Sequence, residues 1–327
     1  MLTINGSRLE GGGQIVRMAV TLSALTRTPI EIISIRANRS TPGLAAQHIA
    51  AIRAVGSLCN AETTGLVIGS DCITFIPNQL RRTSVFIDIG TAGSIPLVIQ
   101  AWLPVALHSG GEITIRGGTE VTRSPTIDYL IHVLITQLTA MGAKVDLSII
   151  RRGYYPQGGG EVKVQAEKSW FHPFRISEEV RSSMGICSCS SNLPDHVTER
   201  QAIAARTELA TIINRDIPVY IDRKSGISTG SSCTVWLGGK GACSVGKRGL
   251  PAEKVGKMAA NELINELSGS GSVDSHLSDQ LLIYLTQSGG SFTTSAVTLH
   301  AETMCWLLTQ FGFVIKYKKN GAVEFSA

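Results

Sequence analysis

The stretch Ile30–Pro77, IEIISIRANRSTPGLAAQHIAAIRAVGSLCNAETTGLVIGSDCITFIP, combines one helix pattern with three strand patterns. Apolar residues recur at helical spacing around Leu44–Cys59, and an asparagine follows them. The strand pattern IEIISIRA precedes this helix, and AETTGLVIG and CITFIP follow it. Another helix pattern, Gly13–Thr26, lies upstream. This order predicts a βαβαββ unit of about 80 residues.

The same order recurs in two later parts of the chain. The second copy has helix patterns at Ser94–His108 and Ile127–Met141, with the strands GEITIRGG, GAKVDLSII and GGEVKVQAE. The third has helix patterns at Leu277–Ser288 and Thr303–Phe311, with the strands SFTTSAVTL, FVIKYKK and GAVEFSA. Because self-similarity at a fixed period indicates repeated units, we expect an α/β (α+β) fold whose main domain contains three βαβαββ repeats.

The third copy is interrupted by another α/β pattern. Its first strand is expected at Pro173–Ser177, but its first helix begins only near His276. Between them lie MGICSCSS, the helix HVTERQAIAARTELATIIN, the strands VYIDR, SCTVWL and GACSVG, and the helix PAEKVGKMAANELINEL. We therefore predict a main domain of residues 1–177 and 270–327 and a smaller inserted α/β domain of residues 178–269. Ser268–Ser275 would be the return linker, flexible by composition.

The composition excludes several classes of protein. Of the 327 residues, 43% are hydrophobic and 17% are charged, which is typical of globular rather than disordered chains. No apolar run approaches the length of a membrane span, so no membrane association is expected. The first residues, MLTINGSRLEGGG, lack the pattern of a signal peptide. A net charge of +5 permits a polyanionic partner but falls short of a dedicated nucleic-acid coat.

The seven cysteines are scattered and odd in number, which favours reduced thiols and a cytoplasmic protein. Cys187 and Cys189 alternate within one strand pattern and should share a face. No second pair follows at zinc spacing, so buried small side chains are favoured over a metal site. The segment Gly241–Arg248, GACSVGKR, approximates a P-loop but has arginine where magnesium needs Ser or Thr, and no helix opens at its lysine. We interpret it as a strand and turn.

Three glycines, Gly11 to Gly13, stand between Glu10 and the first helix. A glycine loop at a helix N-terminus presents backbone N–H groups and the positive end of the helix dipole to an anion. Glu10 could hold a metal ion that neutralises phosphate. A plain turn before a helix is the alternative, and for glycines alone it is the commoner case. Arg17, one turn into the helix, favours a phosphate site.

A second candidate cluster surrounds the start of the helix at Leu44. Arg36 and Arg39 flank the end of a strand, and Gln47 and His48 lie in the first turn of the helix. Two guanidiniums beside a helix N-terminus suit a terminal phosphate. The alternative is two solvated arginines and a core histidine, which on its own is the commoner arrangement.

Three further segments carry polar residues in a helix pattern or at its start. Gln100 is the lone large polar residue of an apolar helix, where it either bonds backbone or reaches a ligand. In VDSHLSDQLLIYL, Ser275 or Ser278 can cap a helix, and a capping box explains Asp279 and Gln280 without a ligand. His300 lies where a strand gives way to a helix, and the helix dipole favours the neutral, nucleophilic imidazole. A surface histidine in a loop is the alternative.

Together these segments resemble the RNA 3′-terminal phosphate cyclase family. The resemblance rests on EGGGQIVR, IRANRSTPGLAAQH, GTAGS with a glutamine six residues after its serine, YYPQGGGEV, GLPAEKVG, HLSDQL, and LH before the last helix. These motifs run in family order over essentially the whole chain, although the last departs from some members in spacing before the histidine. The family has three βαβαββ units with a smaller inserted α/β domain. Enolpyruvyl transferases share the unit but use different site residues.

The resemblance implies ATP-dependent conversion of an RNA 3′-phosphate to a 2′,3′-cyclic phosphate. A histidine attacks the α-phosphate of ATP, AMP moves to the RNA 3′-phosphate, and the 2′-OH then displaces AMP. By motif, the nucleophile falls on His300 and the metal-linked carboxylate on Glu10, with Mg or Mn left open. The ATP contacts fall on Gln100, His276, Leu277, Ser278, Asp279 and Gln280. The residues that handle phosphate and RNA fall on Arg17, Arg36, Arg39, Gln47 and His48.

Two rival functions belong to other classes. Relatives in ribosome assembly resemble the cyclases but lack the nucleophilic histidine, so the presence of His300 favours the enzyme. A general nucleic-acid-binding module is disfavoured because only 6% of the residues are aromatic and stacking platforms need aromatic rings. The sequence leaves open which RNA is used, whether the protein is a monomer or a homodimer, and what the insert does.

Overall fold

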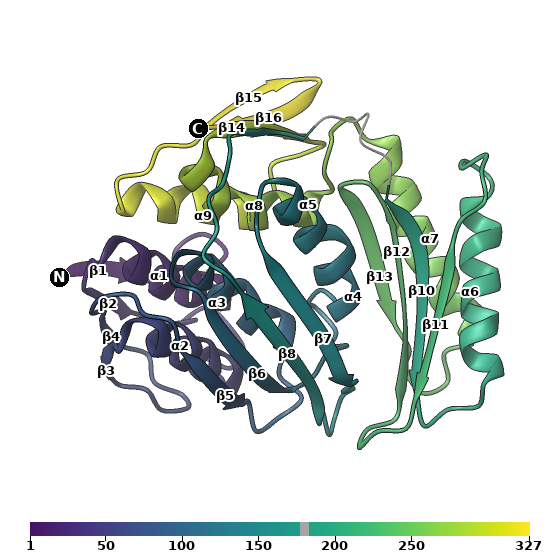
Figure 1. Cartoon of the computed structure of the whole chain (residues 1–327), viewed down its shortest axis with the longest axis horizontal. Coiled ribbons are helices and arrows are strands. Elements are labelled where there is room, and N and C mark those ends of the chain that lie inside the picture. The colour runs from purple at the N-terminus through teal and green to yellow at the C-terminus, as the bar shows by residue number, and fades with distance from the viewer. Residues whose placement is uncertain (177–182) are drawn as a thin grey trace.

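The protein is a mixed α/β chain, and the residues that the structure describes form four separate sheets covered by helices (Figure 1). The structure is a computed structural model that describes residues 1–176 and 183–327. Within those residues, no helix combines the length and apolarity needed to cross a bilayer. The predicted domain boundary between residues 177 and 178, and Ser177 itself, lie outside the described residues.

The first sheet has the strand order β1-β2-β4-β3. Its strands are β1 (Leu2–Asn5), β2 (Ile30–Ile33), β3 (Glu62–Thr64) and β4 (Ile73–Ile76). The helices α1 (Gly13–Thr26) and α2 (Ala46–Cys59) connect them and pack on each other. β1 pairs in parallel with β2, whereas β4 is antiparallel to both β2 and β3.

The second sheet has the order β5-β6-β8-β7. Its strands are β5 (Ser84–Asp88), β6 (Gly111–Gly117), β7 (Val145–Arg151) and β8 (Gly160–Ala166). One connection is α3 (Ile95–Ser109), and the other is a continuous helical run of α4 (Ile127–Tyr129), the π-helix η1 (Leu130–Ile135) and α5 (Thr136–Ala140). The pairing is again one parallel pair followed by two antiparallel pairs.

The third sheet has the order β15-β16-β14-β9 and the same sequence of parallel and antiparallel pairs. Its strands are β9 (Phe174–Arg175), β14 (Gly290–Thr294), β15 (Lys316–Asn320) and β16 (Ala322–Ser326). Its helices are α8 (Ser275–Ser288) and α9 (Leu299–Gln310). The long gap between β9 and α8 contains the fourth sheet.

The fourth sheet has the order β11-β10-β12-β13. Its strands are β10 (Met184–Ser191), β11 (Val219–Lys224), β12 (Gly230–Leu237) and β13 (Lys240–Val245). The helices α6 (His196–Leu209) and α7 (Ala252–Ser268) pack on each other and on one face of this sheet (Figure 1). The expectation that GACSVGKR is a strand and turn is confirmed, because β13 ends at Val245 and the next helix begins only at Ala252.

Two apolar clusters form the core of the described residues. The larger one joins the first three sheets and their helices, and the smaller one lies between the fourth sheet and α6 and α7. Cys187, Cys189 and Trp236 of the fourth sheet belong to the larger cluster. The fourth sheet therefore uses one face for its own helices and the other for contact with the rest of the molecule.

The expected linker Ser268–Ser275 is held by hydrogen bonds, so its predicted flexibility is wrong. The backbone N–H groups of Ser272 and Val273 both donate to the carbonyl of Thr293, at 2.9 and 3.0 Å. Val273 also forms an isolated bridge with Gly239 of the fourth sheet. Composition predicts how flexible a segment is in isolation, but in this protein long-range backbone hydrogen bonds hold Ser268–Ser275 in place.

A buried ionic network ties the second sheet to the fourth. Arg152 donates to Glu120, to both carboxylate oxygens of Asp128, and to Asp222 of β11, at 2.7 to 3.0 Å. Arg152, Glu120 and Asp128 are almost fully buried. Burial raises the pKa of Glu120, and the Arg152 charge opposes that rise. The network satisfies the guanidinium only when the two sheets are in place.

We expect Arg152→Met to lower the free energy of unfolding by about 3–5 kcal/mol, because it leaves two carboxylates buried without their cation. Denaturant unfolding would measure the loss. Arg116→Met is the matched control, since Arg116 pairs with Glu161 on a half-exposed surface and such pairs contribute about 1 kcal/mol or less. Equal effects of the two substitutions would contradict a structural role for the network.

Candidate functional site

A cavity of about 450 Å³ opens between α1, α3, α8, the first turn of α9 and β13. Its polar lining includes Gln14, Arg17, Gln100, Asp279 and His300, which come from four different helices. The apolar lining includes Met18, Leu97, Pro125, Ile283 and Tyr284, among others. A cavity of this size with a few convergent polar groups is typical of a small-molecule site.

His300 lies in the first turn of α9, which begins at Leu299 and is capped by the Thr298 hydroxyl. Its Nδ1 lies 3.0 Å from Oε1 of Gln14. Burial, followed by the charges of Arg17, His276 and Arg39, lowers the pKa of His300. The imidazole is therefore neutral near pH 7, and a neutral imidazole has one ring nitrogen with a free lone pair.

Gln14 is a site residue that the sequence analysis missed. Its Nε2 donates to Oδ2 of Asp279 at 2.7 Å, so its amide joins Asp279 on α8 to His300 on α9. Only 7% of Gln14 is exposed. The available signal was a glutamine in the first turn of a helix whose only other large polar residue is Arg17, which resembles the signal that identified Gln100.

Arg17 and Asp279 carry opposed charges in the cavity wall. Burial lowers the pKa of Arg17 to about 10, and Asp279 opposes that shift. Burial also raises the pKa of Asp279 to about 7. The Nε atom of Arg17 is buried and has no hydrogen-bond partner within the described part of the chain. An incompletely satisfied buried guanidinium is suited to a polyanionic ligand.

The remaining predicted ATP residues divide into two groups. Gln100 and Gln280 line the cavity and bond to each other at 2.8 Å, and His276 lines it as well. The side chains of Leu277 and Ser278 are fully buried and are not among the cavity-lining residues. Ser278 donates to the carbonyl of Ser275 instead.

Helix α8 is capped by Asp274, so the expected cap at Ser275 or Ser278 is wrong. One carboxylate oxygen of Asp274 accepts from the backbone N–H groups of His276 and Leu277, at 2.8 and 2.7 Å. The other accepts from the N–H of Gly241 at 2.9 Å, and the Tyr129 hydroxyl donates to both oxygens. The cap is thus part of a contact between the third and fourth sheets.

The glycines at the entrance of α1 make room for the side chains of Glu10 and His48. Gly11 has a φ of +59°, which favours glycine. A Cβ at Gly12 would collide with the Glu10 carboxylate, and one at Gly13 would collide with the imidazole of His48 and approach Arg17. The residues of this loop therefore permit Glu10 and His48 to approach the start of α1.

The second predicted cluster lies against this loop and contains Arg39, Arg36, Gln47 and His48. Arg39 forms an ion pair with the Glu10 carboxylate and also donates to the backbone carbonyl of Glu10. Arg36 donates to the carbonyl of Gly43 at 2.7 Å. Gln47 accepts from the backbone N–H of Ser94, which caps α3. Arg17 adjoins both His48 and the cavity, so the cluster and the cavity meet at the first turn of α1.

His48 is a buried neutral imidazole. Its Nδ1 accepts from the backbone N–H of Ala45 at 3.0 Å, so the ring proton is on Nε2. Burial, then Arg17 and Arg36, lower its pKa to about 3. The His48 side chain faces inward, since only 3% of the residue is exposed.

Glu10 is the residue best placed to hold a metal ion. Its Oε2 is buried without a hydrogen-bond partner among residues 1–176 and 183–327, while the other oxygen pairs with Arg39. Magnesium ions in phosphate sites commonly use one or two carboxylates together with substrate oxygens. The orphaned oxygen fits that chemistry.

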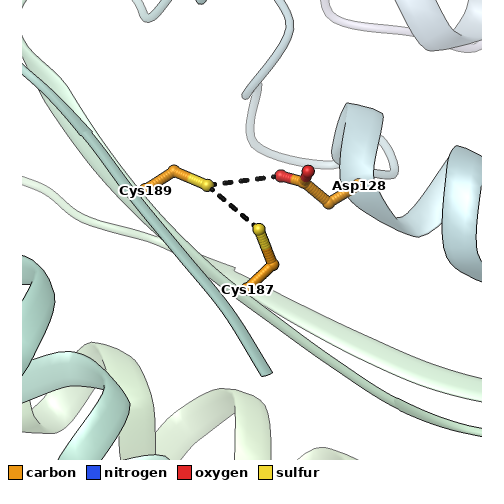
Figure 2. A group of neighbouring side chains, drawn as sticks. All are labelled: Asp128, Cys187 and Cys189. Carbon is orange, nitrogen blue, oxygen red and sulfur yellow. Dashed lines mark hydrogen bonds between the residues drawn. The ribbon is translucent and has the colours of Figure 1, made fainter. Parts of the chain in front are cut away.

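Asp128, Cys187 and Cys189 form another potential metal-ligand group within the described residues (Figure 2). The two sulfur atoms lie 3.5 Å apart, and the Cys189 sulfur lies 3.5 Å from Asp128. Although burial favours its neutral form, the Arg152 charge holds the pKa of Asp128 below its usual value. Burial raises the pKa of Cys189. A carboxylate already neutralised by arginine and a Cys189 thiol kept protonated fit a packed core, as the sequence predicts, better than a cation site.

The fourth sheet and its helix α7 contribute one wall of the cavity through Cys243 and Glu262. Glu262 lies 3.7 Å from the imidazole of His276. Mainly through Glu262, the pKa of His276 is raised to about 9, which keeps a positive charge at the N-terminus of α8. That charge adds to those of Arg17 and Arg39 around His300.

Comparison with known proteins places this geometry in context. The family model described as RNA 3′-terminal phosphate cyclase matches residues 8–317. Proteins with the name RNA 3′-terminal phosphate cyclase are 44% identical in Methanococcoides burtonii and 43% identical in Methanosarcina barkeri, each covering 100% of this chain and 99% of the relative. The Pyrococcus furiosus protein of that name is 41% identical over 99% of this chain and 97% of its own length.

We expect His48 to make stability depend on pH. Its folded-state pKa is about 3, and an unfolded histidine titrates near 6.5. Between these values the unfolded chain binds the proton first, so stability is lost as pH falls, with a slope of about 1.4 kcal/mol per pH unit from this residue. Denaturant unfolding at several pH values should show that His48→Gln loses this component.

The exposed His172→Gln is the control for removal of a histidine. The difference between the His48→Gln protein and the parent isolates one residue from the other groups that titrate in the same range. Parallel pH profiles for the parent and His48→Gln would show that His48 is not held neutral by burial.

Proposed function

Because the chain belongs to the RNA 3′-terminal phosphate cyclase family, we propose that it converts the 3′-phosphate of an RNA end into a 2′,3′-cyclic phosphodiester at the expense of ATP. The observation that carries the proposal is the neutral His300, held at a cavity beside Arg17 and Asp279, in a chain that matches the family over nearly its whole length.

The reaction would begin with attack of His300 on the α-phosphate of ATP. The Nε2–P bond forms as the bond to the β-phosphate oxygen breaks, and pyrophosphate leaves. AMP then passes to the RNA 3′-phosphate, and the neighbouring 2′-OH attacks the activated phosphate and releases AMP. Division into steps replaces one difficult condensation by easier displacements, and the last is favoured because the 2′-OH and the phosphate are vicinal.

The cavity supports the proposed ATP site. Gln100, Gln280 and Asp279 supply polar groups to it. The protonated His276 and the guanidinium of Arg17 supply positive charge for phosphates. Leu277 and Ser278 would contribute by fixing the first turn of α8, because their side chains are packed in the core.

The RNA 3′-phosphate would bind at the second cluster, with Arg36 and Arg39 as charged donors and with Gln47 and His48 beside them. The Nε2–H of His48 is a neutral donor, which adds a hydrogen bond without titrating near pH 7. Arg39 is 42% exposed at its side chain and can leave Glu10 to meet an incoming phosphate.

A divalent metal, Mg or Mn, would be held by Glu10 together with substrate oxygens. Such an ion supplies charge neutralisation for a polyphosphate. The role of Glu10 itself is to present a buried carboxylate oxygen at the entrance of α1, and Gly12 leaves room for that carboxylate.

We also propose the domain arrangement expected from the sequence. Three βαβαββ repeats would form a main domain of residues 1–177 and 270–327, and residues 178–269 would be an inserted α/β domain. The shared strand order of the first three sheets and the separate core of the fourth support this division. The seven free thiols are consistent with the expected cytoplasmic location.

A non-catalytic ribosome-assembly role is the alternative. The intact hydrogen bonding around His300 favours the enzyme, since a protein without adenylyl transfer has no need of a neutral imidazole aimed into a cavity. The partners of the enzyme are ATP and an RNA with a 3′-terminal phosphate. Both an isolated chain and a homodimer are compatible with the proposal.

We expect His300→Ala to abolish covalent adenylylation and cyclisation together. Incubation with ATP labelled at the α-phosphate and a divalent metal should leave acid-labile, base-stable label on the parent protein, the pattern of a phosphorus–nitrogen bond. His300→Asn should fail equally because an amide is not a nucleophile, and the exposed His172→Ala should label normally. Persistent label on His300→Ala would move the nucleophile elsewhere.

We expect Arg39→Ala to slow AMP transfer to RNA more than it slows formation of histidyl-AMP. A lost charge-assisted contact to phosphate costs roughly 1.5–3 kcal/mol, which corresponds to roughly 10- to 150-fold in rate. Arg39→Lys should restore only part of the rate, because lysine cannot reproduce the bidentate fork. Single-turnover assays of the two steps would separate them. If labelling by ATP alone is lost as strongly as cyclisation, the cluster holds the triphosphate instead.

A further inference from the structure

We propose that Gln14 is a positioning residue that fixes His300 in the tautomer with its proton on Nδ1, and that Asp279 fixes the direction of the Gln14 amide. This inference rests on the proposed adenylyl transfer for its kinetic consequence. The arrangement itself is a property of three side chains from α1, α8 and α9 that meet in the described structure.

Asp279 decides which end of the Gln14 amide faces which partner. The NH₂ group of Gln14 donates to Asp279 Oδ2, 2.7 Å away. Above its pKa of about 7 the Asp279 carboxylate is ionised and only accepts hydrogen bonds, which fixes this direction of the amide. The carbonyl oxygen of the amide is then left for His300, 3.0 Å from Nδ1. Gln14 is nearly buried, so little water reaches its amide, although His300 itself is exposed.

The carbonyl oxygen of Gln14 in turn decides the tautomer of His300. An amide oxygen has no proton to donate, so Nδ1 must be the donor in this bond. In a neutral imidazole with its proton on Nδ1, Nε2 carries the lone pair. The opposite tautomer would break the bond to Gln14 and place a hydrogen on the atom that attacks.

The proton on Nδ1 also serves the covalent step. When Nε2 attacks the α-phosphorus, the Nε2–P bond forms and the bond to the pyrophosphate oxygen breaks. The ring keeps its Nδ1 proton and becomes cationic, so no proton has to move in this step. In the transfer to RNA, the ring leaves as a neutral imidazole, again without a proton transfer. The Gln14 oxygen accepts from the same N–H throughout.

An amide differs from a carboxylate in this position in one respect. A carboxylate beside Nδ1 would favour the imidazolium before ATP arrives and so block Nε2 with a proton. The charged groups that lower the pKa of His300 are instead cationic: Arg17 on α1, Arg39 in the loop before α2, and His276 on α8. The carboxylate of Asp279 contacts the other end of the Gln14 amide. A neutral acceptor orients the ring without opposing these cations.

The kinetic test compares Gln14→Met with Gln14→Glu. Gln14→Met removes the acceptor and should lower kcat for histidyl-AMP formation roughly 10- to 100-fold, as loss of a histidine's outer partner does in other sites, with little change in the KM for ATP. Gln137→Met is the matched control, because Gln137 is as buried, at 8% exposure, but lies outside the cavity. A raised KM with unchanged kcat for Gln14→Met would make Gln14 an ATP contact and overturn the proposal.

Gln14→Glu should shift the pH profile rather than abolish the rate. The introduced carboxylate and that of Asp279 would share one proton, as adjacent carboxylates do, so their single negative charge would lie partly on the introduced group, which still accepts from Nδ1 and is closer to the ring than Asp279. Its charge should raise the pKa of His300 and move the acid limb of adenylylation upward by about 1–3 pH units. A purely structural role for Gln14 predicts no such movement, so an unshifted limb would contradict the proposal.

The tautomer can be observed directly without any reaction. In the protein with ¹⁵N-labelled histidine, proton–nitrogen correlation spectra assign the protonated ring nitrogen, and His300→Asn identifies the resonance by its disappearance. We expect protonated Nδ1 in the parent and a shift toward protonated Nε2 in Gln14→Met. Protonated Nε2 in the parent, or an unchanged spectrum in Gln14→Met, would overturn the inference. This readout is separate from the proposed function, which fails if no histidyl-AMP forms even when the tautomer is as expected.

Discussion

The first turn of α1 is the constraint on which the site depends. Within five residues, Gly13 admits the imidazole of His48, Gln14 reaches Asp279 and His300, and Arg17 lies between the cavity and the second cluster. The preceding loop is fixed to α9 as well, because the backbone N–H of Glu10 donates to the Thr303 hydroxyl. Residues that are nearly 300 positions apart therefore share one hydrogen-bonded junction. A side chain at position 13 would disturb both the second cluster and the cavity, because it would meet His48 and Arg17. This explains why glycine, which costs conformational entropy, is used there.

The electrostatics of the site follow from the same junction. Burial lowers the pKa of His48 and His300, and nearby positive charges lower it further. These charges are Arg17 and Arg36 at His48, and Arg17, the protonated His276 and Arg39 at His300. Positive charge that favours the neutral form of an imidazole also attracts phosphate groups, because both effects arise from positive charge in a poorly solvated region. The histidines thus remain neutral, one as a donor and the other with a lone pair, where phosphates gather. Neither property requires a carboxylate next to the imidazole.

The helices and most strands could be predicted from local periodicity, because many of them alternate between buried and more exposed residues, as β6 and β8 do. The predicted bounds of α1 and the end of α2 at Cys59 agree with the structure. The site residues named by motif mostly meet at the cavity or beside it. Gln14, the Asp274 cap, the ordered segment before α8 and the Arg152 network were not predicted. Each depends on partners far away in the chain, such as Thr293 for Ser272 or Asp222 for Arg152, and no local pattern encodes such a pairing.

The same long-range contacts explain how a sheet placed between β9 and α8 can complete the cavity. Glu262 and Cys243 line one wall, so the fourth sheet must be held at a fixed distance from α8. Asp274 joins β13 of the fourth sheet to α8, because it caps α8 and also accepts from the N–H of Gly241. Arg152 joins β11 of the fourth sheet to α4, because it donates to both Asp222 and Asp128. Both contacts are buried and hydrogen-bonded to charged groups, which makes partial separation costly. The fourth sheet therefore behaves as part of the cavity wall, and it also sets the charge of His276 through Glu262.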